Sequence, residues 1–269
     1  SISKEDMVKY LNLLEIDVEG DTIKVPSFRP DLNLMADIAE EVGRSYGYNE
    51  IPTTAFKTST QGGYSPFMMA EAKAGALCRS LGYSEIITYS FVSPTIFDQI
   101  RLDAASPLRN AMKIQNPLGE DTSIMRTIAV PSMLDILSRN NAYHNRSAKL
   151  YELAKIYLPI EGQTLPEEPK MLTLGTYGAG ETFFTLKGEL EAIFAGLRMP
   201  KAAYTAVKDN PTYHPGRCAM VSINGVELGY MGQIHPLVAE GYGLDCEVYC
   251  AELNFNKLFD LQLPEPTYT

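Results

Sequence analysis

Tryptophan is absent from the 269-residue chain, which has only three histidines and four cysteines. None of the cysteines (Cys78, Cys218, Cys246 and Cys250) forms a C-x-x-C pair, and their spacing is irregular. This pattern does not indicate a disulfide framework, so we interpret them as reduced thiols of an intracellular protein. A zinc site that joins His214 to the last three cysteines is an alternative, but scattered core thiols are the favoured interpretation.

Basic residues are also scarce: 23 Lys and Arg stand against 33 Asp and Glu, giving a net charge of -10. Such a chain does not fit a generic nucleic-acid binder, because phosphate contacts need Lys and Arg. No apolar run is long enough to span a membrane, and no signal-peptide pattern is present. We therefore predict a cytoplasmic protein with no membrane partner. The 45% hydrophobic content is typical of a globular chain with a sizeable core.

Strand and helix patterns alternate along the chain. The clearest strand patterns cover residues 16–25, 84–92, 110–118 and 218–232. The Asn224-Gly225 pair lies between two alternating runs and is the strongest hairpin signal, and Gly20-Asp21 marks a second hairpin. Adjacent hairpin strands favour an antiparallel sheet with helices packed on it, so the predicted fold class is α+β.

Composition also predicts the domain organisation. Residues 53–65 are rich in Thr, Ser and Gly, which is typical of a linker. Before it, residues 1–52 read as helix, hairpin and helix, a small arrangement of winged-helix type. After it, residues 66–263 form the larger α+β domain.

Four carboxylates crowd the helix pattern in RPDLNLMADIAEEV, residues 29–42: Asp31, Asp37, Glu40 and Glu41. The last three share one helix face, where each like-charge pair costs about 0.2–0.5 kcal/mol. A divalent cation such as Mg²⁺, which prefers oxygen ligands, would remove the repulsion. The alternative is an acidic helix that faces solvent, and spacing alone favours that alternative.

A family resemblance adds to this interpretation. Five stretches resemble, in order, the bacterial-type beta subunit of phenylalanine–tRNA ligase: RPDLNLMADIAEEVGRSYGYNEIP (29–52), GYSEIITYSFV (82–92), NPLGEDTSIMRTIAVPSMLDILSRN (116–140), LYELAKIY (150–157) and HPGRCAMVSINGVELGYMGQIHP (214–236). The resemblance implies a small, metal-binding, winged-helix-like domain, of which this chain holds part. It also implies a class II synthetase-like antiparallel sheet flanked by helices.

The family makes Phe-tRNA from phenylalanine, ATP and tRNA. The resemblance therefore implies an alpha subunit as partner in an alpha2beta2 heterotetramer, and tRNA(Phe) as partner of the full complex. It also implies a Mg²⁺ site, shared with the alpha subunit, at Asp31, Asp37, Glu40 and Glu41. With the resemblance included, metal binding becomes the favoured interpretation of the acidic helix.

The sequence departs from the class II pattern at the ATP site. Leu150 stands where the Arg of an Arg-x-Glu strand is expected, although Glu152 is kept. The glycine-bearing stretch GYMGQIHP lacks an Arg as well. We therefore expect the isolated chain to be inactive and to support a catalytic alpha subunit. We expect its partner surface to include residues 66–81 and 116–140, marked by an exposed apolar stripe.

The resemblance further implies that the tRNA-binding-like, editing and anticodon-binding domains of the family are missing. Residues 264–269 resemble the start of the linker to the last of these. Two alternatives stay open. A stand-alone nucleic-acid-binding module would need a basic recognition helix, whereas this helix is acidic. A regulatory synthetase paralogue would bind a different enzyme.

Two other stretches contain residues that often take part in catalysis. His214 and Arg217 in HPGRCA are a possible general base and anion clamp, but a turn with a salt-bridged Arg217 is favoured. Arg126 lies near Asp121 and Ser123. An ion pair at an interface is the favoured role for Arg126.

Overall fold

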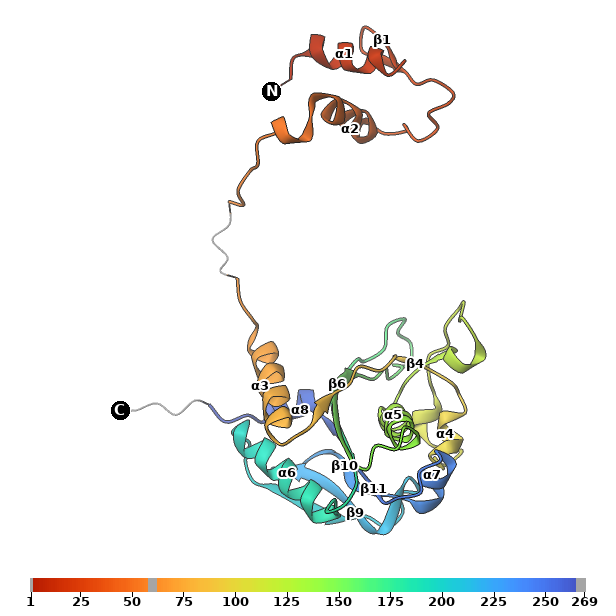
Figure 1. Ribbon diagram of the computed structural model, residues 1–269, viewed down its shortest axis with the longest axis vertical. Coiled ribbons are helices and arrows are strands. Elements are labelled where there is room, and N and C mark those ends of the chain that lie inside the picture. The colour runs from red at the N-terminus through yellow and green to blue at the C-terminus, as the bar shows by residue number, and fades with distance from the viewer. Residues whose placement is uncertain (1, 58–61, 265–269) are drawn as a thin grey trace, which may run out of the picture. The chain divides into compact units, whose positions relative to one another are not determined.

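The computed structural model describes residues 2–57 and 62–264 (Figure 1). Contacts divide the chain into two compact units, residues 1–62 and 63–269, so the division falls inside the predicted linker. The parts of the predicted linkers at 58–61 and 265–269 lie outside the described residues. Within the described ranges, no helix has the length and apolar character to cross a membrane.

The first unit is built from two helices and a hairpin. Its elements are α1 (Lys4–Leu13), β1 (Asp17–Glu19), β2 (Thr22–Lys24), α2 (Met35–Tyr46) and the short 3-10 helix η1 (Tyr48–Glu50). Ser3 caps α1 by accepting the N–H of Asp6 at 3.1 Å. Leu11, Ile38 and Val42 pack between the helices. The predicted helix–hairpin–helix order is present, and the winged-helix assignment stays a prediction.

A seven-stranded sheet forms the second unit, in the order β3-β6-β7-β11-β10-β9-β8. Its strands are β3 (Ser84–Glu85), β6 (Ala148–Lys155), β7 (Lys170–Tyr177), β8 (Ala202–Ala206), β9 (Tyr213–Ile223), β10 (Val226–Ile234) and β11 (Val248–Asn254). All neighbours are antiparallel except β3 and β6, which are parallel. The prediction of an antiparallel sheet is therefore wrong at this one edge, where the chain reaches β6 after a long crossover.

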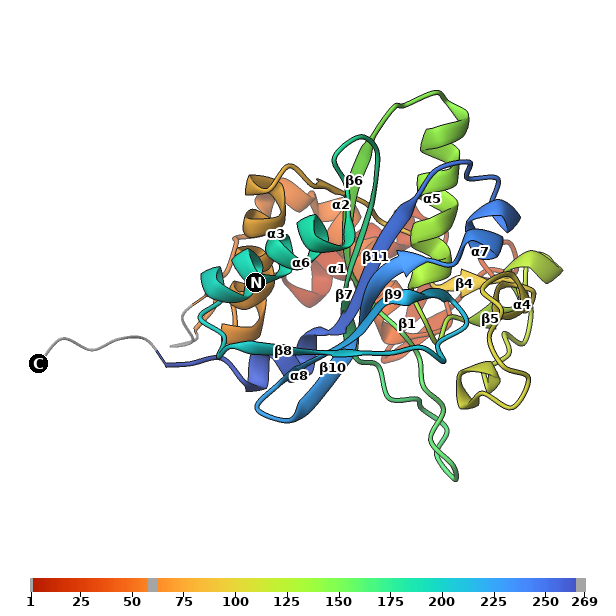
Figure 2. The same ribbon diagram turned by 90° about the horizontal axis from the view of Figure 1, so that it is seen from below.

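Helices cover both faces of this sheet (Figure 2). On one face lie α3 (Pro66–Ser80), α6 (Phe183–Gly196) and α8 (Phe255–Asp260), and on the other lie α5 (Val130–Ala142) and α7 (Pro236–Gly241). The short helices α4 (Ile96–Gln99), η2 (Pro107–Arg109) and η3 (Glu120–Thr122) lie between β3 and α5 in sequence. The predicted α+β class, with a synthetase-like sheet flanked by helices, is confirmed.

The hairpin predicted at Asn224-Gly225 is confirmed. Both residues have positive φ, 50° and 80°, as a two-residue turn of type I′ requires. They join β9 to β10, the two longest strands of the sheet.

Two strand predictions are wrong. Residues 84–92 do not form one strand: β3 ends at Glu85, and Phe91–Val92 forms β4, which pairs with β5 (Ile124–Met125) in a separate two-stranded sheet. Between them, the N–H of Thr88 donates to the side chain of Glu152 instead of to a strand backbone. Residues 110–118 contribute only a single bridge, Lys113 to Ile124. In both segments, contacts distant in sequence override the local pattern.

Candidate functional site

The acidic helix of the first unit is held by an arginine. Arg29 donates from Nε to Asp31 at 3.0 Å and from Nη2 to the same carboxylate at 2.7 Å. The same Nη2 donates to Glu41 at 2.6 Å. One guanidinium therefore joins two of the four carboxylates predicted to bind metal.

Glu41 is the most enclosed of the four carboxylates. Its second oxygen accepts from Arg44 Nη2 at 2.5 Å, so two cations flank a buried anion. Hydrogen bonds from Arg29 and Arg44 hold the pKa of Glu41 below its usual range, and Arg29 likewise lowers the pKa of Asp31. The charge crowding on α2 is thus relieved within the chain by arginines.

The other two carboxylates have separate roles. Asp37 accepts the N–H groups of Asn33 and Leu34 at 2.8 and 2.6 Å, which closes the start of α2. Glu40 is exposed, and its side chain forms no hydrogen bond or ion pair with the described residues. No group of three or more Asp, Glu, His or Cys side chains in residues 2–57 and 62–264 is arranged to hold a metal ion. In this arrangement, Arg29 occupies oxygens of two of the four carboxylates, Asp31 and Glu41.

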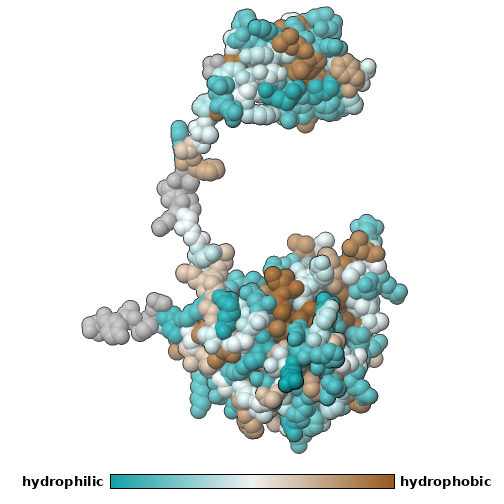
Figure 3. All heavy atoms as spheres, viewed as in Figure 1, coloured by the Kyte–Doolittle hydropathy of each residue, from teal (hydrophilic) through white to brown (hydrophobic). Residues whose placement is uncertain are grey.

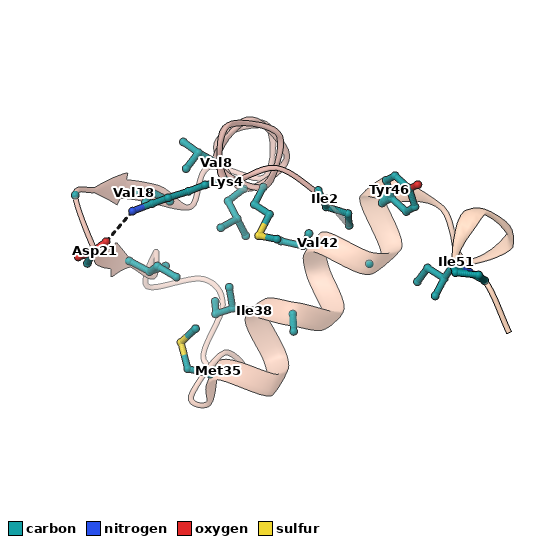
Figure 4. Close-up of a pocket in the computed structure, with 17 residues that line it drawn as sticks. Ile2, Lys4, Val8, Val18, Asp21, Met35, Ile38, Val42, Tyr46 and Ile51 are labelled. Atoms are coloured by element: carbon teal, nitrogen blue, oxygen red, sulfur yellow. Dashed lines mark hydrogen bonds and ion pairs between the residues drawn. The ribbon is translucent and has the colours of Figure 1, made fainter. Parts of the chain in front are cut away.

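An apolar groove of about 720 Å³ lies in the first unit (Figure 4). Val8 from α1, Val18 from the hairpin and Ile38 and Val42 from α2 line it. A Lys4–Asp21 ion pair at 2.7 Å lies at its rim. None of the four predicted ligands lines this groove, so the groove and the acidic cluster are separate sites.

A buried polar cluster lies in the second unit, on the sheet face that α5 covers. Arg126 is 1% exposed and donates from Nη1 to Thr88 Oγ1 at 2.7 Å. Its Nη1 lies 3.4 Å from Glu152, and its Nε donates to the carbonyl of Lys155 at 2.9 Å. The favoured prediction of an ion pair at an interface is wrong: Arg126 is buried within the unit, and its anionic partner is Glu152.

Glu252 lies two strands from Glu152 on the same sheet face, because both are register partners of Thr173. Its carboxylate accepts the N–H groups of Ala129 and Val130, at the start of α5, at 2.9 and 3.1 Å. Burial raises the pKa of Glu252 to about 7, against the opposing effects of these hydrogen bonds and of Arg126.

This pKa predicts a pH-dependent stability. The folded pKa lies above the ordinary 4.5, so the contribution of Glu252 is fully present below pH 4.5 and is lost as pH rises through 7. The loss amounts to about 2–3 kcal/mol. Urea unfolding at pH 5 and pH 8 of the wild type and Glu252→Gln will measure it, because the other titrating groups are shared. Equal pH dependence in both proteins would contradict the assignment.

Side chains pack closely on the sheet face that carries Glu152. Leu150 is buried in the core under α5, and α5 approaches β7 so closely that a Cβ on Gly175 would lie 2.6 Å from Met133 Cγ. The next large hollow, of about 630 Å³, is lined from α6, β8 and β9 and includes neither Leu150 nor Glu152. Leu150, which stands where the ATP-site arginine is expected, is therefore a buried core residue packed under α5.

The HPGRCA stretch forms structural contacts. His214 Nδ1 accepts the N–H of Gly216 at 3.0 Å. Arg217 donates to Gln233 at 2.7 Å and to Glu247 at 3.0 Å. The predicted salt bridge of Arg217 is confirmed, but the predicted turn is wrong, because residues 214–217 lie within β9. The four cysteines are free thiols.

An apolar ridge runs from the segment after β3 into β4, and the sequence did not indicate the part of it at residues 87–91. We define it as Ile87, Tyr89 and Phe91, together with Leu118, which precedes η3, a helix that contacts β4. Ile87 is 92% and Tyr89 82% exposed, and Leu118 is fully exposed. Figure 3 shows hydrophobic surface on the side of the second unit where β4 and β6 are labelled in Figure 1. The signal in the sequence is the alternation of Ile87, Tyr89 and Phe91 with Thr88 and Ser90. It would have indicated the ridge if the apolar side of this segment had been assigned to a partner protein.

Comparison with known proteins yields two family matches. Residues 51–255 match the model described as the phenylalanyl tRNA synthetase beta chain CLM domain, and residues 1–48 match the tRNA synthetase B5 domain. Relatives named phenylalanine–tRNA ligase beta subunit include those of Clostridium tetani (45% identity over 264 residues) and Clostridium acetobutylicum (42% over 265). Each alignment covers 96% of this chain and 33% of the relative, so the chain spans about a third of their length.

Proposed function

The chain belongs to the family of phenylalanyl-tRNA synthetase beta chains, and from this premise we propose that it supports the catalytic alpha subunit of phenylalanine–tRNA ligase without catalysing a step itself. The partner follows from the name of the relatives, since a beta subunit implies an alpha subunit. The assembly is an alpha2beta2 heterotetramer in the cytoplasm that binds tRNA(Phe).

The apolar ridge is the observation that carries this proposal. Soluble domains seldom expose several large apolar side chains together unless a partner covers them. Ile87, Tyr89, Phe91 and Leu118 would lie in water if the second unit acted alone. On the expected partner helix α3, Met68 and Met69 are also exposed. We therefore assign the alpha-subunit contact to the ridge and, as a separate patch, to the exposed methionines of α3.

A supporting role also agrees with the sheet face that carries Glu152. Glu152 is engaged by Thr88 and lies beside Arg126, and Leu150 is packed under α5, so no free cation is presented to a phosphate there. Phenylalanine-dependent exchange of pyrophosphate into ATP tests this. We expect none from the chain alone and a higher rate from the alpha subunit once the chain is added. Exchange catalysed by the chain alone would contradict the proposal.

The Mg²⁺ site is also a proposal and rests on the family resemblance. Asp31, Asp37, Glu40 and Glu41 would hold the ion together with ligands from the alpha subunit. Because Arg29 occupies oxygens of Asp31 and Glu41 in this chain, a metal there must compete with the guanidinium. As a hard cation, Mg²⁺ would bind carboxylate oxygens from both subunits and so link them at their contact.

A metal titration separates binding from folding. Glu40→Ala removes a carboxylate without other contacts, so it should weaken Mg²⁺ binding to the alpha complex and leave the stability of the first unit unchanged. Asp37→Ala also removes a helix cap, which costs about 1 kcal/mol. Calorimetric Mg²⁺ titration and urea unfolding of both variants measure the two effects. Unchanged Mg²⁺ affinity in Glu40→Ala would remove Glu40 from the proposed site.

A further inference from the structure

The segment that carries the ridge is anchored at both ends by backbone hydrogen bonds and in the middle by side chains. Its start is held by the N–H of Ile86, which donates to the carbonyl of Tyr151 at 2.9 Å. Its end is held by the carbonyl of Ser90, which accepts the N–H of Arg126 at 2.9 Å. Between these two points, Thr88 faces inward and is held by Glu152. Extended backbone places alternate residues on opposite sides, so an inward Thr88 directs its two neighbours outward.

Glu152 binds both the backbone and the side chain of Thr88. Its Oε1 accepts the Thr88 N–H at 2.7 Å, and both of its oxygens lie 2.9 Å from Thr88 Oγ1. Arg126 closes the set by donating to the same hydroxyl at 2.7 Å. Since all three side chains are in a largely buried environment, losing one partner leaves polar groups unsatisfied away from water.

We propose that Glu152, Arg126 and Thr88 form a clamp that positions the apolar ridge for the alpha subunit. Glu152 stands at the glutamate of an Arg-x-Glu pattern whose arginine is replaced by Leu150. In this chain, that glutamate holds the docking segment in place. The clamp residues are positioning residues, because the exposed side chains next to them make the contact.

The inference rests on the proposed function, since it needs the alpha subunit as the partner of the ridge. The chain offers a matched control. Glu152 and Glu252 are both buried, lie on the same sheet face and each accept backbone N–H donors. Glu252 caps α5, however, and has no hydrogen bond to residues 84–92. Glu152→Gln and Glu252→Gln thus make the same substitution in similar surroundings, and measurement at pH 8 keeps Glu252 above its pKa of about 7.

The test measures affinity of the full chain for the alpha subunit by biolayer interferometry. Glu152→Gln should bind about tenfold or more weakly, which corresponds to the loss of one buried charged hydrogen-bond partner. Thr88→Val, which keeps the shape and the backbone N–H, should weaken binding in the same direction and serves if Glu152→Gln does not fold. Glu252→Gln should bind like the wild type.

Hydrogen exchange supplies a local readout that a general loss of stability would not produce. Backbone amides of residues 86–91 should exchange faster in Glu152→Gln and keep their wild-type rate in Glu252→Gln. A double-mutant cycle adds a second criterion. If the clamp acts through the ridge, Glu152→Gln should have little further effect on affinity once Ile87 is replaced by Ala and Tyr89 by Ala.

The outcomes separate the two claims. Equal loss of affinity in both Gln variants, or an unchanged affinity in Glu152→Gln, would overturn the clamp while leaving the alpha-subunit contact in place. Absence of binding by the wild-type chain would overturn the proposed function and the docking role of the clamp. Faster exchange confined to residues 86–91, together with weaker binding, would support both.

Discussion

Tyr89→Asp is expected to reduce affinity for the alpha subunit at least a hundredfold. Large aromatic side chains at the centre of an interface often account for several kcal/mol of binding. Aspartate removes that apolar contact and places a carboxylate where water would be excluded, which adds a desolvation cost. Tyr143→Asp is a matched control, because Tyr143 at the end of α5 is 77% exposed against 82% for Tyr89. It should leave affinity within about threefold, as substitutions outside hot spots do.

Surface plasmon resonance of the two variants and the wild type decides this prediction. Circular dichroism would show that both variants are folded, because both tyrosine side chains are solvent-exposed. Equal affinities of Tyr89→Asp and the wild type would move the partner surface away from the ridge. An equal loss in Tyr143→Asp would show that added negative charge anywhere on this acidic chain weakens association.

Arg126→Met is expected to destabilise the second unit by about 3–5 kcal/mol, the usual cost of removing one partner from a buried ion pair. The substitution leaves Glu152 with a buried charge and no cation at 3.4 Å. It also leaves the carbonyl of Lys155 and the hydroxyl of Thr88 without their guanidinium donor. Urea unfolding, followed by far-UV circular dichroism, measures the change in the free energy of unfolding.

Lys155→Met provides the comparison, because Lys155 ends β6, the strand that carries Glu152. The Lys155–Glu168 pair has an N–O distance of 2.6 Å, yet the two side chains are 48% and 39% exposed. Solvent screens such pairs, so the loss should be at most about 1 kcal/mol. A loss for Arg126→Met no larger than that for Lys155→Met would mean that the buried cluster contributes little to stability.

Local signals predicted those parts of the fold that local geometry determines. Asn224-Gly225 fixes a hairpin because few other pairs tolerate positive φ at both positions. Ser3 and Ser65 cap α1 and α3 by the same kind of local contact, since each accepts the N–H three residues onward. The acidic helix α2 is predictable because the apolar residues that define it, such as Ile38 and Val42, recur at helical spacing within one short segment.

Contacts between distant residues could not be predicted in this way. The partner of Arg126 is Glu152, which lies 26 residues away on β6 and which no local pattern indicates. The clamp on Thr88 crosses 64 residues and breaks a segment whose own pattern indicates a continuous strand. At the acidic helix, Arg29 lies only two residues from Asp31, but its link to Glu41 depends on how the loop before α2 folds back.

Sedimentation velocity of the chain mixed with a phenylalanine–tRNA ligase alpha subunit, with and without Mg²⁺, tests the central claim most directly. The account predicts a complex that sediments faster than either component and is weakened by Tyr89→Asp but not by Tyr143→Asp. Separate sedimentation of the two proteins at micromolar concentration, in both the presence and absence of Mg²⁺, would contradict the assignment of this chain as a support of the alpha subunit.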